Sequence, residues 1–111
     1  MLFAVTLTRG GPWDWSRGLR EQEGFEEHAR IMDAFVADRF ILLGGPLEGE
    51  GEGEGEREGE RERAVLHVIE ADSEEAVRER LAQDNWHANG MLTVTSVRRW
   101  TVLLDGLRAI L

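Results

Sequence analysis

Two spacings of hydrophobic residues divide this chain into strands and helices. Residues 2–8, 40–47, 64–70 and 91–100 are short apolar runs or alternate apolar with polar positions, which predicts four strands. Between them, apolar residues recur every three or four positions over 21–37 and 72–83, which predicts two amphipathic helices. Asp72 or Ser73 is the expected N-cap of the second helix. The Gly44-Gly45-Pro46 sequence is expected to close the second strand with a tight turn.

The order of these elements predicts the fold class. Strand, helix, strand, spacer, strand, helix, strand is typical of the ferredoxin-like split βαβ arrangement, an α+β fold with an antiparallel four-stranded sheet and two helices on one face. A length of 111 residues suits one domain, so we expect a single domain over 1–111. The helix-free sheet face would hold either Phe3, Val5 and Leu7 or Ala4, Thr6 and Thr8. Either set needs cover, and a second sheet would supply it, which predicts a homodimer.

The spacer, residues 48–63, alternates glutamate with glycine and arginine. Eight glutamates stand against three arginines, and no apolar residue could anchor the run to a core. We therefore expect a flexible Glu/Gly-rich loop joining the second and third strands. A calcium-binding or protein-docking segment is the alternative, but the aspartate/asparagine pattern of a specific calcium loop is missing.

Charge and composition limit the classes of binding partner that we expect. A net charge of −9 and a pI near 4.8 disfavour nucleic acid and anionic membrane surfaces. No apolar stretch approaches the roughly 20 residues needed to cross a bilayer. The lack of cysteine excludes disulfides and, together with a start unlike a signal peptide, fits a cytoplasmic location.

One histidine and one aspartate are candidates for chemistry. His28 lies between Phe25 and Met32 on the inward stripe of the first helix, and Asp84 continues the inward stripe of the second helix. If both helices cover one sheet face, an imidazole and a carboxylate are directed into a shared interior. A carboxylate beside an imidazole orients the ring and favours its positively charged form. Such a pair is the basic unit of general acid–base catalysis. A structural hydrogen bond between helix ends is the alternative.

Other residues are candidates for contacts with a small-molecule ligand. His67 alternates within its strand and either lines a pocket or makes a cross-strand hydrogen bond. The tryptophans either roof an apolar pocket or fill the core. His87 is expected to be exposed, and without an HExxH-like pairing of the histidines we expect no metal site. The candidate substrate-binding residues are His67, Trp86, Trp13, Gly45 and Pro46.

Two segments, EQEGFEEHARIMDAFVADRFILLGGPL and DNWHANGMLTVTSVRRW, resemble the YCII-related (YciI-like) family. The resemblance runs from the first strand to Trp100 and omits the acidic spacer and the tail. It implies a ferredoxin-like fold that pairs into a dimeric α+β barrel. The histidine and aspartate that recur in the family as its active-site pair match His28 and Asp84. The chain departs from the family at Asn85, where proline is usual, and at Arg39, where glycine is common.

These two departures carry structural expectations. Asn85 leaves its turn less rigid than proline would, and Arg39 is strained if that position requires a positive φ. Related dimeric barrels include muconolactone isomerases, dehalogenases and small monooxygenases that act on cyclic or aromatic compounds. The resemblance therefore implies a cofactor-free proton-transfer reaction, with His28 as general base or acid and Asp84 as the group that orients it. The sequence leaves open a non-catalytic barrel that binds a small ligand, and a purely structural dimer.

Overall fold

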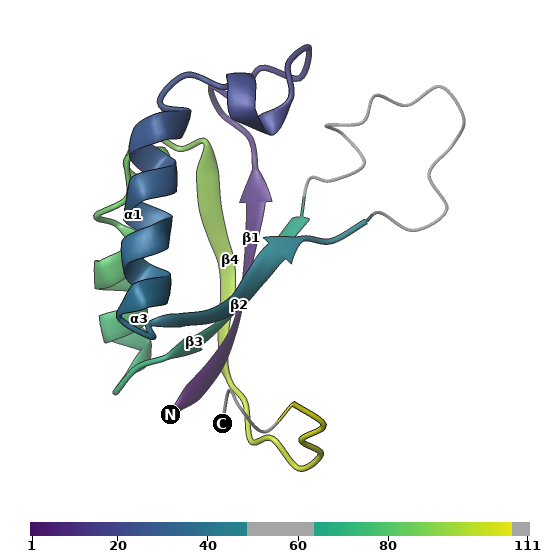
Figure 1. Ribbon diagram of the computed structural model, residues 1–111, viewed down its shortest axis with the longest axis vertical. Coiled ribbons are helices and arrows are strands. Elements are labelled where there is room, and N and C mark those ends of the chain that lie inside the picture. Colours follow the sequence, from purple (N-terminus) through teal and green to yellow (C-terminus); the bar gives the residue numbers. More distant parts are fainter. Residues whose placement is uncertain (49–63, 108–111) are drawn as a thin grey trace.

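The computed structural model describes residues 1–48 and 64–107 and contains one antiparallel sheet of four strands (Figure 1). The strand order is β2-β3-β1-β4, so each helical connection joins two strands that have another strand between them. This order confirms the predicted split βαβ fold class. The strand bounds are β1 Leu2–Arg9, β2 Ile41–Pro46, β3 Ala64–Glu70 and β4 Leu92–Arg99.

The helices cover one face of the sheet (Figure 1). The first predicted helix is divided into a 3-10 turn, η1 (Leu19–Glu21), and helix α1 (Phe25–Ala37), because Gly24 at the N-cap has a left-handed φ of 80°. The second predicted helix is shorter than expected. It forms α3 (Glu74–Leu81), and the Ser73 hydroxyl caps it by accepting the Ala76 amide at 3.0 Å.

The alternation of buried and half-buried residues along β1 shows which face of the sheet the helices cover. Phe3, Val5 and Leu7 are buried, whereas the intervening residues are only half-buried. The first of the two sets therefore builds the core, and Ala4, Thr6 and Thr8 lie on the helix-free face. The core is completed by side chains from every strand and from the helices: Trp13, Phe35, Phe40, Ile41, Val65, Ile69, Val77, Leu81, Trp86, Met91 and Leu92.

The glycine-glycine-proline segment was expected to form a turn, and this prediction is wrong. Gly44, Gly45 and Pro46 continue β2 and pair with β3. Gly44 lies opposite His67, and a Cβ atom at Gly44 would lie 2.2 Å from the His67 Nδ1 atom. Glycine is therefore required there by the close approach of the His67 ring rather than by a turn.

Helix α1 ends in a Schellman motif that uses an unusual residue. Arg39 has a φ of 60°, and its amide donates to the Val36 carbonyl at 3.0 Å. The next amide, of Phe40, donates to the Phe35 carbonyl at 2.9 Å, and the two phenylalanine rings pack with centroids 5.1 Å apart. The position thus requires the left-handed conformation, and Arg39 adopts it without the freedom of glycine.

Residues 100–107 contribute no side chain to the buried core. The predicted loop at 48–63 lies outside the described residues except for Glu48, and the last four residues of the chain also lie outside them. Residues 100–107 have no regular secondary structure and leave a cavity of about 100 Å³ against the helix-free sheet face. No helix in the described part of the chain is long and apolar enough to cross a membrane.

Candidate active site

A histidine from α1 and an aspartate beside α4 (Asn85–Ala88) meet in the interior. The His28 Nδ1 atom lies 2.7 Å from the Asp84 Oδ1 atom, and Asp84 is 0% exposed. Asp84 does not continue α3, as the periodicity suggested, but is the N-cap of α4, where its Oδ2 atom accepts the His87 amide at 3.3 Å. The α4 cap thus orients the carboxylate toward the imidazole. Because the carboxylate oxygen accepts, the Nδ1 atom of His28 donates, and its Nε2 atom remains for a ligand.

The two residues after Asp84, Asn85 and Trp86, fix the position of the His28–Asp84 pair. The Trp86 ring stacks on the His28 ring with centroids 4.0 Å apart and an interplanar angle of 13°. Its Nε1 atom donates to the Glu23 carbonyl at 2.8 Å, and the Asn85 amide nitrogen donates to the Gly24 carbonyl at 3.0 Å. Both bonds join α4 to the segment that precedes α1. Asn85 therefore secures its turn through a side-chain bond, whereas proline would act through a restricted φ.

His28 lines a cavity on the helix side of the sheet, which we call the helix-side cavity. Its volume is about 220 Å³. Every residue predicted to contact a ligand lies in its wall, while Asp84 lies behind His28. The lining residues are Arg9, Trp13, Leu19, His28, Met32, Val36, Ile41, Gly44, Gly45, Pro46, Val65, His67, Trp86 and Leu92.

His67 contributes a neutral polar group to this wall. It is 8% exposed, and its Nδ1 atom is buried without a hydrogen-bond partner. Burial is the main cause that lowers the pKa of His67 from 6.5 to about 4, and repulsion from the charges of His87 and His28 adds to it. The alternative of a cross-strand hydrogen bond finds no support, because the residues opposite His67 are Gly44 on β2 and Val5 on β1, and neither has a polar side chain.

His87 was expected to be exposed, and this prediction is wrong. The side chain is half-buried, its Nε2 atom is buried without a partner, and burial lowers its pKa. His87 lines a different cavity, of about 290 Å³, between α3 and β4. The reason is the short helix α4, which turns the His87 side chain inward, whereas an irregular turn would have left it in solvent.

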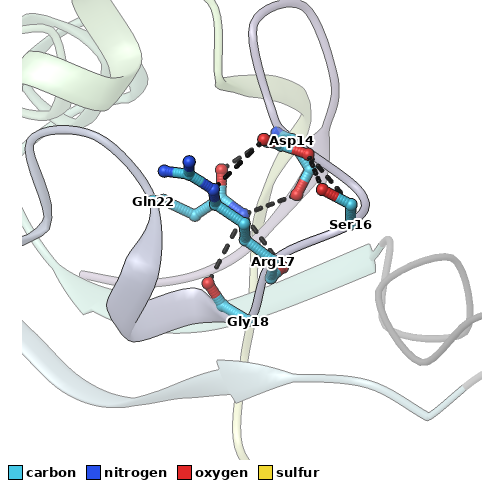
Figure 2. A network of polar contacts seen from close by, with 5 residues as sticks. All are labelled: Asp14, Ser16, Arg17, Gly18 and Gln22. Carbon is cyan, nitrogen blue, oxygen red and sulfur yellow. Dashed lines mark hydrogen bonds and ion pairs between the residues drawn. The ribbon is translucent and has the colours of Figure 1, made fainter.

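A polar network shapes the loop that brings Trp13 to the cavity (Figure 2). The side chain of Gln22 is buried and accepts the Asp14 amide at 2.9 Å. Its amide nitrogen donates to the carbonyls of Asp14 at 2.7 Å and Arg17 at 3.0 Å. One glutamine side chain thus satisfies backbone groups on several sides of the loop, which fixes the place of the neighbouring Trp13.

Arg9 is a charged wall residue that the sequence analysis missed. It is 5% exposed, and its guanidinium carbon lies 4.6 Å from the centroid of the Trp13 ring. The predicted strand ended one residue earlier, at Thr8. The alternation that places Phe3, Val5 and Leu7 inward also places Arg9 inward, so the period-two pattern contained the signal.

The wall holds no arrangement typical of a metal centre. Across residues 1–48 and 64–107, no three histidine, aspartate or glutamate side chains gather in a group that could hold a metal ion. The polar groups that do gather here are two imidazoles, one carboxylate behind them and one guanidinium. This set can orient a ligand and move a proton.

Comparison with known proteins supports the fold. No family model matches the chain, and no curated protein matches it. Among solved structures, 5-chloro-2-hydroxyhydroquinone dehydrochlorinase from Burkholderia phenoliruptrix AC1100, in complex with 2,5-dihydroxybenzoquinone, is similar with a TM-score of 0.62. The similarity covers 91% of this chain and 94% of that chain at 24% identity, a level that establishes a shared fold.

Proposed function

We propose that this protein catalyses proton transfer on a small cyclic or aromatic compound bound in the helix-side cavity. The observation that carries the proposal is the His28 imidazole, which is held by a fully buried carboxylate and lines an apolar cavity. His28 acts as general base or acid through Nε2, and Asp84 orients the ring and stabilises the imidazolium that forms. The stacked Trp86 ring keeps the imidazole plane fixed during this exchange.

The structural neighbour supports the reaction class. It is a dehydrochlorinase of a chlorinated hydroquinone, and removal of hydrogen chloride requires the transfer of a proton. In such an elimination, the Nε2 atom of His28 takes a proton and the leaving group departs with its bonding electron pair. The compound then loses one molecule of acid, and the reaction needs no oxidant and no cofactor.

We also propose that residues 1–111 form a single domain of the YCII-related family and that it works as a cytoplasmic homodimer. The family resemblance of the His28 and Asp84 segments supports the assignment. Apolar side chains near the helix-free face support the dimer, since Leu103 and Leu104 are 87% and 92% exposed. Sedimentation equilibrium at micromolar concentration tests the dimer, and a stable monomer would contradict it.

The catalytic proposal is tested with 5-chloro-2-hydroxyhydroquinone and a panel of phenols, quinones and lactones. Chloride release and deuterium exchange at ring carbons are followed by ion electrode and NMR. We expect turnover by the wild type and a loss of roughly 10²- to 10⁴-fold in His28→Gln. Arg78→Gln, on the exposed surface of α3, is the matched control and should keep the wild-type rate. An unchanged rate in His28→Gln, or no turnover of any compound, would contradict the proposal.

A further inference from the structure

His67 is a polar residue of the helix-side cavity that the proposed proton transfer does not use. It lies on β3, opposite Gly44 of β2 and Val5 of β1, and its side chain is 8% exposed. Its Nδ1 atom is buried without a hydrogen-bond partner. Burying a polar side chain in this way costs free energy, and a hydrogen bond to a bound ligand would offset that cost.

The two ring nitrogens of His67 differ in their surroundings. A Cβ atom on Gly44 would lie 2.2 Å from Nδ1 and 2.8 Å from Cε1, so this edge of the ring packs on the Gly44 backbone. Nε2 is therefore the nitrogen that remains for a ligand. An N–H group at Nδ1 would be buried without an acceptor, which is rarer in proteins than an unused lone pair. The proton of neutral His67 accordingly belongs on Nε2, which makes Nε2 a donor.

From this arrangement we propose that the helix-side cavity takes single-ring compounds that carry a carbonyl group, such as cyclic ketones and lactones, and that the Nε2 atom of His67 donates a hydrogen bond to the carbonyl oxygen. During the reaction this bond stabilises the negative charge that develops on the oxygen while His28 moves the proton. The catalytic role of His67 rests on the proposed function, whereas its contact with the carbonyl does not.

His67 is suited to this role because it is neutral near pH 7. Burial, and to a smaller extent the charges of His87 and His28, lower its pKa from 6.5 to about 4. A neutral imidazole is a weak acid, so it polarises a carbonyl by hydrogen bonding without giving up its proton. His28 is then the group that exchanges a proton with the ring, and the two histidines have separate tasks.

The two imidazoles reach the cavity from different layers of the fold. His28 belongs to α1 and His67 to β3, and α1 lies over this face of the sheet (Figure 1). The charge of His28 contributes to the lowered pKa of His67, and such an effect requires the two rings to be close. A small ring bound between the layers can therefore meet His28 on the helix side and His67 on the sheet side.

The size of the cavity limits the ligand to one ring. A dry cavity of about 150 Å³ holds benzene, whereas pockets for drug-sized ligands start at about 300 Å³. The helix-side cavity, at about 220 Å³, lies between these values. A six-membered ring with one or two small polar substituents fits this volume, and a fused two-ring compound exceeds it.

The chemistry needs only these two histidines. The Nε2 atom of His28 takes a proton from the ring carbon next to the carbonyl. The electron pair of the broken C–H bond forms a C=C bond, and the π pair of the carbonyl moves onto the oxygen that His67 holds. Return of the proton to the same carbon gives exchange, and return to another carbon gives isomerisation. If the neighbouring carbon carries a leaving group, its departure with the bonding pair restores the carbonyl and completes an elimination.

The contact with the carbonyl is tested with cyclohexanone carrying a heavy-carbon label at its carbonyl. Isotope-edited infrared spectroscopy gives the C=O stretching frequency of the bound ketone, which falls when a donor bonds to the oxygen. We expect a lower frequency in the wild type than in His67→Phe, which keeps a ring but lacks the N–H group. His67→Gln, whose amide also donates, should recover part of the difference. Equal frequencies in the wild type and folded His67→Phe would overturn the proposal.

Calorimetry measures the same contact as an affinity. In His67→Phe the affinity for cyclohexanone should fall by roughly three- to tenfold, because one hydrogen bond is lost. The affinity for methylenecyclohexane, in which a CH₂ group replaces the oxygen, should stay within about twofold. An equal loss for both ligands, or no binding of cyclohexanone at millimolar concentration, would overturn the proposal. Circular dichroism verifies that each variant is folded.

The catalytic role is tested by deuterium exchange at the ring carbons next to the carbonyl of cyclohexanone, followed by NMR. Loss of one donor to a developing oxyanion lowers kcat by roughly 10²- to 10³-fold, and we expect a loss of this size in His67→Phe. His67→Gln should keep part of the rate. Arg78→Gln, on the exposed surface of α3, is the control and should exchange at the wild-type rate. A wild-type rate in folded His67→Phe would overturn the catalytic role.

The outcomes separate this inference from the proposed function. If the infrared difference is present but no compound is exchanged or turned over, the proposed function fails and the carbonyl contact of His67 stands. If exchange is lost in His28→Gln but is unchanged in His67→Phe, the proposed function stands and the inference about His67 fails.

Discussion

Acid should destabilise the fold through His67, and the structure sets the size of the effect. The side chain is 8% exposed, and burial lowers its pKa from 6.5 to about 4. Above pH 6.5 neither the folded nor the unfolded chain holds the extra proton. Between pH 6.5 and 4 the unfolded chain binds a proton that the folded chain does not. The free energy of unfolding therefore falls as the pH falls through this window.

The magnitude follows from the difference between the two pKa values. Each unit of difference between the folded and unfolded pKa values corresponds to about 1.4 kcal/mol. Between pH 6.5 and 4 the free energy of unfolding should therefore fall by about 3 kcal/mol. Small domains have total stabilities of about 5–15 kcal/mol, so a loss of this size is measurable. The contribution is fully present above pH 6.5 and is lost progressively down to pH 4.

The assay is urea unfolding, followed by tryptophan fluorescence at fixed protein concentration between pH 7.5 and 4. His67→Gln keeps a polar side chain of similar size and removes the titration. We expect its stability to depend less steeply on pH than that of the wild type, with the difference confined to the stated window. His87→Gln should also make the stability depend less steeply on pH, because burial lowers the pKa of His87 too. Parallel wild-type and His67→Gln curves from pH 7 to 4 would refute this reasoning.

Three substitutions test the local geometry. In Asp84→Asn the amide can accept only one of the two hydrogen bonds that the carboxylate accepts, so urea unfolding should show a loss of about 1–3 kcal/mol, and an unchanged midpoint would contradict this. At residue 39, whose φ is 60°, Arg39→Gly should be more stable than Arg39→Ala by about 1 kcal/mol, and equal melting temperatures would show that backbone strain is absent. Gly44→Ala places a methyl group 2.2 Å from the His67 Nδ1 atom, so its melting temperature should fall by the equivalent of about 1–3 kcal/mol, and a wild-type value would mean that the ring is free to move.

Much of the fold was predictable because it depends on local periodicity. Alternation places the side chains of a strand on two faces, and the three- and four-residue spacing places those of a helix on one stripe. The strand order then followed from the sequence of elements. The pattern did not show that Gly24 delays α1 until Phe25 or that α3 ends at Leu81, because helix ends depend on single backbone conformations.

The candidate site was partly predictable for the same reason. His28 lies on the inward stripe of α1, and Asp84 is buried beside it. The position of Asp84 differs from the prediction, because it contacts His28 as the N-cap of α4, a short helix that the spacing did not predict. Their contact is observed, and their catalytic role stays a prediction. Arg9 follows from strand alternation but was missed because the predicted strand was one residue too short.

The sequence by itself determined which side chains face inward on each strand and helix, because that property depends on backbone geometry over a few residues. Only the tertiary structure decided which inward groups meet. The cavity is bounded by β1, the Trp13 loop, η1, α1, β2, β3, α4 and β4, so its lining residues are drawn from positions 9 to 92 of the chain. Whether Gly44 turns or pairs, and whether His67 finds a partner, depends on residues more than 20 positions away. Contacts over such separations are set by packing, which no local pattern records.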